Sequence, residues 1–428
     1  MASLGRRCIP FALVAAAAAW LVSTISTTGD WPTDSAPAVE ALAHGHVSDY
    51  LSATAMMGPF STLVQAPFAA LAPAGDLTTC RWAAFPCILA VGLLGLYLAA
   101  IAGRRGAPGS FRVLLAALCV FNPLTVEALR SGHPEEILTA ALLVAAVATA
   151  AEDRRWAAAL FLGLALASKQ WAVLGILPVL MALPSGRIRA ALVAAAVAAL
   201  LILPGLVVSP ESFSEVQGKA ASTGRVVTPW SVWYPVATEV TEVHRVGETR
   251  MVATVREAPA VVGELSHPLI VLLFFVLPLG LALKRRRLGL SGAEAMALLA
   301  LLALVRAALD PVDNFYYHAP LLLALLGWDA IAPQGRLPLR GLLGAAVALL
   351  LWDLWKDISD PDLFNAIYVT FALVGTGLLV AALSNKKGPS TRLQVDSPSS
   401  FSPNDKFWLD EDPVSGIKRT ASGSIRPR

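Results

Sequence analysis

Residues 81–103 of the chain read RWAAFPCILAVGLLGLYLAAIAG, and the pair Arg104-Arg105 follows directly. This run is long enough to cross a bilayer, since a membrane-spanning helix needs about 20 mostly apolar residues. Arginines that cluster at one end of such a helix usually mark its cytoplasmic end. The stretch therefore predicts a membrane-spanning helix with a defined orientation.

Similar apolar segments lie on both sides of this run. The 428-residue chain is 56% hydrophobic and 15% charged, whereas about a quarter of an ordinary soluble domain is charged. This composition excludes a soluble enzyme and predicts an all-α polytopic membrane protein with about 12 spans, within a range of about 11–13. The predicted spans cover residues 8–27, 81–103, 112–129, 136–151, 156–168, 171–184, 188–208, 267–283, 292–309, 316–332, 341–355 and 363–383.

The charged residues separate onto the two sets of connections. Basic residues occur on alternate connections, which predicts that these connections and both termini are cytoplasmic. The opposite connections hold most of the acids and would face the extracytoplasmic side of the cell membrane. The basic set includes Arg6, Arg7, Arg104, Arg105, Arg154, Arg155, Arg187, Arg189, Lys284, Arg287, Arg336, Arg340, Lys386 and Lys387, and the acidic set includes Asp30, Asp34, Glu40, Asp49, Glu135, Glu136, Asp310, Asp313, Asp357, Asp360 and Asp362.

The connections differ in character. We expect residues 1–385 to form one polytopic transmembrane domain and the polar tail 386–428 to be disordered in the cytoplasm. The first outer connection, 28–80, contains the apolar segment Met56–Leu71, which is too short and too broken by prolines to span and is typical of an interfacial or re-entrant helix. The long outer loop 209–266 contains aromatic residues that commonly anchor a loop at the lipid headgroups, namely Trp230, Trp233 and Tyr234.

Two details of this arrangement stay open. The first span follows Arg6-Arg7 and is followed by small residues at Ser23–Thr28, so it also resembles a cleavable signal peptide. Segments 156–168 and 171–184 form either two short helices or one long helix, because Lys169-Gln170 interrupts the apolar run between them. We favour two helices with Lys169 at their outer apex, since a lysine at the bilayer centre costs about 3 kcal/mol.

The sequence lacks the motifs of metal, nucleotide and nucleic-acid binding sites. Cys8, Cys80, Cys87 and Cys119 lie in or beside apolar runs and form no CxxC pair, so they indicate neither a zinc site nor a disulfide framework. The sequence contains neither a GxxxxGK[ST] phosphate loop nor an HExxH zinc motif. The basic residues form no clustered face for nucleic acid. We therefore expect no metal, no cofactor and no nucleic-acid partner.

Asp34 is the first candidate for chemistry, just beyond the first span in the segment Gly29–Ser35. A carboxylate near the membrane surface is suited to act as a general base, because partial desolvation raises its pKa toward a useful value. Asp30 is the alternative base. The non-catalytic interpretation is that Asp34 caps a following short helix.

The turn Ser131–Glu136 holds three further candidates, His133, Glu135 and Glu136. The two acids begin a predicted helix after Pro134, and favourable alignment with the helix dipole would by itself explain them. It does not explain the histidine. An imidazole and two carboxylates on the outer face could orient sugar hydroxyls, so we interpret them as binding residues for an acceptor or a sugar.

Lys169 and Gln170 interrupt an otherwise apolar stretch. A cation in such a place indicates a functional site, and the partner that suits a lysine here is the phosphate of a lipid substrate. The alternative is a lysine that extends along apolar surface to the interface.

The segment Asp310–His318 opens the tenth predicted span and supplies Tyr317 and His318. Its tyrosines are also typical of an interfacial aromatic belt. His318 needs a polar partner, and it could donate to a phosphate or orient a hydroxyl.

Taken in order, these motifs resemble the GT-C superfamily of membrane glycosyltransferases and, more narrowly, glycosyltransferase family 87, whose members depend on polyprenyl-phosphate-mannose. The resemblance covers about residues 1–385. It departs from the family at His133, where glutamine is common, and at Gln170, where proline is common. The motifs that carry it are Thr33-Asp34, Gly132-His133-Pro134-Glu135, Lys169-Gln170-Trp171 and Tyr316-Tyr317-His318.

The resemblance implies transfer of a hexose, most simply mannose, from a polyprenyl-phosphate donor to a lipid or glycan acceptor. It implies Asp34 as base, Lys169, Gln170 and His318 at the donor phosphate, and His133, Glu135, Glu136 and Tyr317 at the acceptor or sugar. No nucleotide or metal is then required. The alternatives are a transporter or flippase for a polar or lipid-linked solute, in which the same charged groups bind substrate or relay protons, and a membrane scaffold.

Overall fold

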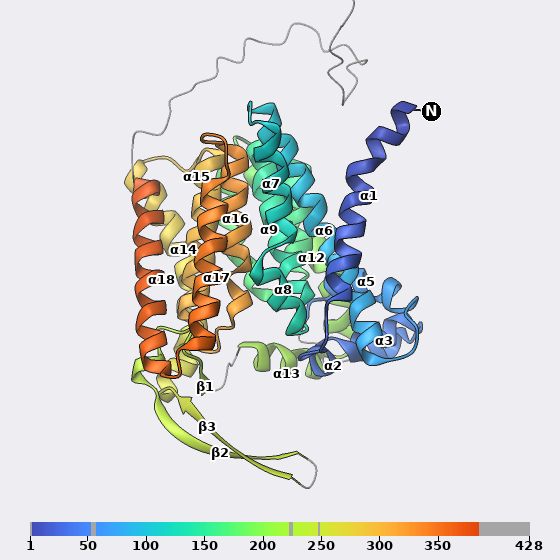
Figure 1. Cartoon of the computed structure of the whole chain (residues 1–428), viewed down its shortest axis with the longest axis vertical. Coiled ribbons are helices and arrows are strands. Elements are labelled where there is room, and N and C mark those ends of the chain that lie inside the picture. The colour runs from blue at the N-terminus through green and yellow to red at the C-terminus, as the bar shows by residue number, and fades with distance from the viewer. Residues whose placement is uncertain (1, 53–56, 222–225, 247–248, 385–428) are drawn as a thin grey trace, which may run out of the picture. The chain divides into compact units, whose positions relative to one another are not determined.

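The computed structural model describes residues 2–52, 57–221, 226–246 and 249–384 (Figure 1). Residues Pro10–Asn385 form one compact unit, and the fold described below is that of this unit. The predicted tail 386–428 and Met56 lie outside the described residues.

Every predicted span coincides with a helix or with a pair of consecutive helices, which confirms the all-α membrane class. Among the described residues, seven helices are long and apolar enough to cross a membrane, so the predicted number of spans remains a prediction. The helices that match predicted spans are α1 (Ala2–Ser23), α6 (Asp76–Arg104), α7 (Gly109–Val120) with α8 (Pro123–Arg130), α9 (Pro134–Ala151), α10 (Arg155–Leu166), η1 (Gln170–Gly175) with α11 (Ile176–Ala182), α12 (Arg187–Val208), α14 (Ala260–Arg285), α15 (Gly292–Leu309), η3 (Phe315–His318) with α16 (Ala319–Ile331), α17 (Leu339–Asp357) and α18 (Pro361–Ser384).

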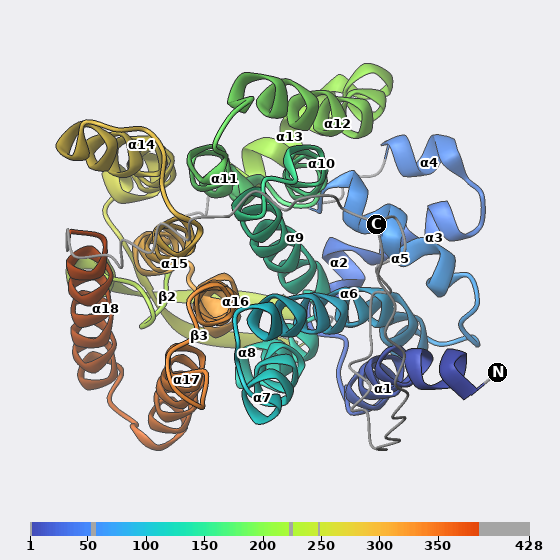
Figure 2. The ribbon, with the colours of Figure 1, turned by 90° about the horizontal axis from the view of Figure 1, so that it is seen from above.

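Helix α9 is the centre of the core. It packs against α6, α10, α11, α15 and α16 (Figure 2), and every residue from Pro134 to Ala150 is buried. Its many alanines let neighbouring backbones approach closely, which favours helix association in a membrane. Helices α12, α14 and α18 lie at the periphery, where exposed leucines and valines such as Leu192, Leu272 and Leu378 suit contact with lipid.

The described part of the first predicted outer connection contains four short helices, α2 (Trp31–Asp34), α3 (Ala36–Ala43), α4 (Val47–Ser52) and α5 (Pro59–Ala69). Helix α5 falls inside the predicted interfacial segment Met56–Leu71. Its depth relative to a bilayer remains a prediction. Helices α3 and α5 pack on each other and α5 packs on α6, so the connection is fixed to the core.

The long connection 209–266 contains structure that the sequence analysis did not predict. After α13 (Pro210–Ala221) come β1 (Val226–Val227), η2 (Tyr234–Val236), β2 (Thr238–Val246) and β3 (Thr249–Glu257). The strands form an antiparallel sheet in the order β1-β3-β2, and β2 and β3 project from the helices as a ribbon (Figure 1). We call this end of the helices the hairpin end. The many threonines and valines of β2 and β3 favour strands, but neither segment is an apolar run of spanning length.

The segment between β1 and η2 is fastened to the helices by its aromatic residues. The Trp230 ring is 5% exposed and lies against Phe315, Trp355, Phe364 and Tyr368. Its neighbour Trp233 donates from Nε1 to the carbonyl of Leu309. The expectation that Trp230 and Tyr234 anchor the loop at the headgroups is wrong, because both side chains are buried within the protein.

Asn365 holds the same segment from α18. Its Nδ2 atom donates to the carbonyls of Pro229, at 2.9 Å, and Ser231, at 2.8 Å, and the side chain is 2% exposed. We expect Asn365→Ala to lower the free energy of unfolding by about 1–3 kcal/mol, because the buried Ser231 carbonyl and the partly buried Pro229 carbonyl lose their donor. Thermal unfolding of purified protein in detergent measures this. Thr370→Ala, on the same helix, is the control, because the Thr370 hydroxyl is exposed and bonds only within α18. Equal shifts for both variants would contradict the prediction.

Candidate functional site

The site lies at the hairpin end, where two loops are interlocked through glycines. The Asp30 amide donates to the Ser131 carbonyl at 3.0 Å. Gly29 (φ +52°) and Gly132 (φ +80°) both adopt left-handed conformations, and a Cβ on either would lie within 2.5 Å of the backbone of the other loop. Only glycine permits this close approach. The loop before α2 is thereby placed against the N-terminus of α9.

This contact brings Asp30 to His133. The Asp30 Oδ2 atom is 3.4 Å from His133 Nε2, and His133 Nδ1 is 3.1 Å from Glu135 Oε1. The imidazole is buried and stacks on the Tyr316 ring, with 5.1 Å between centroids. Burial by itself lowers the pKa of His133, but hydrogen bonds to Asp30 and Glu135 outweigh it and raise that pKa to about 9. The hydrogen bond from His133 also lowers the pKa of Asp30.

Lys169 joins the same cluster from the turn between α10 and η1. Its Nζ atom is 3.1 Å from Glu135 Oε1 and 3.2 Å from Glu136 Oε1, and the lysine side chain is only 13% exposed. The open question about segments 156–168 and 171–184 is settled, since two helices meet at this residue. A buried ammonium shared by two carboxylates is a fixed charge rather than a mobile interfacial lysine.

Arg306 of α15 completes the cluster and was missed by the sequence analysis. Its guanidinium lies between the rings of Trp171, at 4.6 Å, and Tyr317, at 4.3 Å, and Nη1 is 3.7 Å from Glu136 Oε2. The available signal was its place within the apolar run 292–309, since an ionisable residue inside a predicted span indicates function. Tyr317, predicted as a sugar contact, is thus in the cluster as a partner of this arginine.

Acids and bases balance in this cluster, since Asp30, Glu135 and Glu136 face His133, Lys169 and Arg306. Four buried polar atoms there have no hydrogen-bond partner among the described residues: Glu135 Oε2, Glu136 Oε2, Arg306 Nη1 and Trp171 Nε1. Buried polar atoms are nearly always hydrogen-bonded, so this unused capacity suits the hydroxyls of a ligand.

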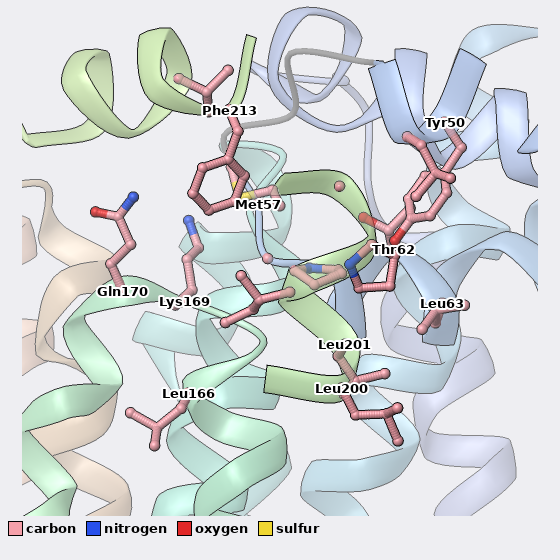
Figure 3. A pocket seen from close by; sticks show the side chains of 17 residues that line it. Tyr50, Met57, Thr62, Leu63, Leu166, Lys169, Gln170, Leu200, Leu201 and Phe213 are labelled. Carbon is pink, nitrogen blue, oxygen red and sulfur yellow. The ribbon is translucent and has the colours of Figure 1, made fainter. Parts of the chain in front are cut away.

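An apolar cavity of about 310 Å³ reaches the cluster at Lys169 and Gln170. Figure 3 shows both side chains on the same side as Phe213, with Leu200 and Leu201 on the facing wall. The walls come from α5, α10, α12, α13 and the segment around Tyr50. The remaining lining residues are mostly apolar and include Leu51, Met57, Pro59, Leu63, Leu166, Ile202, Pro204 and Val216.

Asp34 lies outside the cluster contacts. It is the last residue of α2, and its Oδ1 atom accepts a 2.9 Å hydrogen bond from the Thr33 hydroxyl. The capping interpretation does not hold, because Ser35 rather than Asp34 is the residue that precedes α3.

His318 belongs to a second, neighbouring cluster. Its Nε2 atom is 3.1 Å from the Tyr368 hydroxyl, which donates to Asp313 Oδ2 at 3.1 Å, and its Nδ1 atom is 3.1 Å from the Phe315 carbonyl. Both ring nitrogens therefore contact protein groups. Burial, reinforced by the negative charge of Asp310, raises the pKa of the Asp313 carboxyl well above its usual range.

Comparison with known proteins identifies the family. The model of glycosyltransferase family 87 matches residues 57–309, more than half of the chain. The chain belongs to glycosyltransferase family 87. The match includes Glu135, Glu136, Lys169 and Arg306, and it confirms the predicted resemblance to the GT-C membrane glycosyltransferases.

Two further comparisons concern this family 87 protein. No curated protein matches its sequence. Among solved structures, ArnT from Cupriavidus metallidurans bound to undecaprenyl phosphate is similar, with 17% sequence identity, a TM-score of 0.48, and coverage of 89% of this chain and 70% of that one.

The candidate site combines predicted and unpredicted residues. The predicted residues Asp30, His133, Glu135, Glu136 and Lys169 are brought together, whereas Asp34 bonds to Thr33 and His318 to Tyr368. Arg306 and Tyr368 were not predicted. Tyr368 carries no signal of its own in the sequence, because it is a tyrosine near one end of an apolar helix. Within the described residues, no group of three or more histidine, cysteine, aspartate or glutamate side chains is arranged to hold a metal ion.

Proposed function

We propose that the protein transfers a hexose, most simply mannose, from a polyprenyl-phosphate carrier to a hydroxyl of a lipid or glycan acceptor. The hairpin end would face the extracytoplasmic side of the cell membrane, and both termini the cytoplasm. The observation that carries this proposal is Lys169, a buried ammonium fixed by two carboxylates at the end of an apolar cavity. Family membership supplies glycosyl transfer as the reaction class.

The donor fits this cavity by its chemistry. An apolar chain with a phosphate at one end matches a cavity that is mostly apolar and contains one ammonium. An ammonium has three N–H donors, and two of those of Lys169 are directed to Glu135 and Glu136. The third would bind the donor phosphate, and Gln170, which also lines the cavity, would lie beside it. This arrangement stabilises negative charge that grows on the phosphate as the bond to the sugar breaks.

The sugar would bind over the carboxylates. Glu135 Oε2 and Glu136 Oε2 have no hydrogen-bond partner among the described residues, so both can accept from sugar hydroxyls. Arg306 lies beside Glu136, with Nη1 3.7 Å from the same Oε2 atom, and Tyr317 and Trp171 hold the arginine in place. A sugar placed there would lie between the donor phosphate and the loop that carries Asp30.

We assign the base to Asp30 rather than Asp34. Asp30 contacts the cluster through His133, whereas the Asp34 carboxylate accepts a hydrogen bond from the Thr33 hydroxyl. In the reaction, the acceptor hydroxyl gives its proton to the carboxylate and its oxygen bonds to the anomeric carbon. The bond from that carbon to the phosphate oxygen breaks, and its electron pair stays on the phosphate. His318 is assigned a different role, holding η3 through Tyr368 and Asp313.

The test is sugar transfer from synthetic polyprenyl-phosphate-mannose to membrane lipid extract, with purified wild type, Asp30→Asn and Asp34→Asn. We expect Asp30→Asn to reduce transfer by about 10²–10⁴-fold, the usual contribution of a general base. Asp34→Asn is the matched variant because it makes the same change four residues away. Loss with Asp34→Asn alone would return the base to Asp34.

The same assay decides between transfer and transport. If wild type makes no product from several lipid-linked sugars but moves one of them across a liposome membrane, the transferase proposal is wrong. The charged cluster would then bind a transported solute.

A further inference from the structure

His133 is bonded at both ring nitrogens to carboxylates that come from different parts of the chain. Asp30 belongs to the loop before α2, and Glu135 to the first turn of α9. The Asp30 side chain is 70% exposed, whereas those of His133 and Glu135 are 7% and 0% exposed. The imidazole thus connects an accessible carboxylate to the buried cluster.

We infer that His133 is a positioning residue that holds the Asp30 carboxylate, as an ionised base, over the sugar-binding acids. This inference rests on the proposed function and replaces the sequence-based expectation that His133 binds sugar. A histidine that donates from both nitrogens must carry both protons and is an imidazolium. With both nitrogens used by carboxylates, the ring has no donor left for a hydroxyl.

The surroundings of the ring support the charged form. Asp30 contacts it from the loop before α2 and Glu135 from α9, the Tyr316 ring of η3 stacks on its face, and Lys169 is the neighbouring cation. The two carboxylates outweigh both burial and the lysine, so the pKa of His133 is raised to about 9. The ring is therefore charged below about pH 9, and it loses its second N–H donor as the pH rises through that value.

The variant that tests this role is His133→Gln, whose amide group retains a donor but cannot donate to both carboxylates. We expect kcat to fall about 10-fold or more, because the base is no longer held, while KM for the donor stays within about 2-fold. The acid limb of the kcat/KM profile should move to higher pH, since the hydrogen bond that lowers the pKa of Asp30 is lost. The alkaline decline near pH 9 should disappear. His44→Gln is the control, because His44 is exposed and bonds only to the Glu40 carbonyl.

A second measurement needs no substrate. Titration of the His133 signal by NMR, in protein with ¹³C-labelled histidine and assigned by its absence in His133→Gln, should give a pKa near 9. Asp30→Asn and Glu135→Gln should each lower that pKa. A His133 pKa at or below its ordinary value of 6.5, unmoved by Asp30→Asn, would overturn the inference.

The outcomes separate the two proposals. If wild type transfers sugar and His133→Gln retains the wild-type kcat and pH profile, the positioning role is wrong and the proposed function stands. If the NMR titration succeeds but no lipid-linked sugar is transferred, the proposed function fails while the contact between His133 and Asp30 is still established.

Discussion

Lys169→Ala should strongly reduce sugar transfer and also destabilise the protein. The variant removes the ammonium that contacts both Glu135 and Glu136, which are 0% and 3% exposed. Removing one partner from a buried ion pair costs about 3–5 kcal/mol, because the remaining charge is left uncompensated. Loss of the donor to the leaving phosphate should lower kcat by about 10²–10³-fold. Thermal unfolding and the transfer assay measure the two effects.

A combined variant separates stability from catalysis. Lys169→Met together with Glu135→Gln removes one charge of each sign and leaves Glu136 facing Arg306 and Asp30 facing His133, so stability should return toward wild type while transfer stays lost. Lys169→Arg keeps the charge and should keep the fold, but the planar guanidinium cannot place its donors as the ammonium does. Recovery of transfer in the double variant would show that Lys169 does not act on the donor.

Gly132→Ala should reduce transfer by about 100-fold, the loss that a displacement of about 1 Å in a reactive group can cause. An added Cβ would lie 2.4 Å from the Thr28 carbonyl oxygen and 2.6 Å from the Trp31 amide nitrogen. The loop that carries Asp30 must then move away from His133. The measurement is kcat under saturating donor.

Gly45→Ala is a closely matched control for this variant. Gly45 also has a left-handed conformation, at φ +77° against +80° for Gly132, but no atom lies within 4 Å of its added Cβ. Gly45→Ala has the same cost of placing an alanine in a left-handed conformation, about 1–2 kcal/mol, but its Cβ contacts no neighbouring loop. Equal losses of activity in the two variants would mean that backbone strain, rather than loop displacement, is responsible.

The helices were predictable because their signal is strong and local. Runs such as 81–103 are apolar over a spanning length, and each predicted range coincides with a helix or a helix pair. The ribbon formed by β2 and β3 was not predicted, since its alternating pattern lies in a polar loop that hydropathy treats as uniform. The start of α14 differs by seven residues from the prediction, since the helix begins at Ala260 rather than 267. It continues through Pro268, although proline is more typical of the first turn of a helix.

The site was partly predictable for a similar reason. Lys169, Glu135 and Glu136 stand out as charges beside apolar runs. In the structure, Lys169 Nζ is 3.1 Å from Glu135 Oε1 and 3.2 Å from Glu136 Oε1. Whether Asp30 or Asp34 faces them depends on the approach of Gly29 to Ser131, which joins loops about a hundred residues apart. Such long-range contacts leave no periodic signal in either segment.

The tyrosine that holds His318 has a consequence for how the protein is made. Tyr368 lies on α18, the last helix that the structure describes, and Asn365 of the same helix holds the segment around Trp230. A chain that leaves the ribosome from its N-terminus completes α9 and Lys169 early, but Tyr368 and Asn365 can bond to His318 and to the Trp230 segment only after α18 has emerged. The cluster around Lys169 is thus synthesised long before two of the side chains that hold its neighbouring loops.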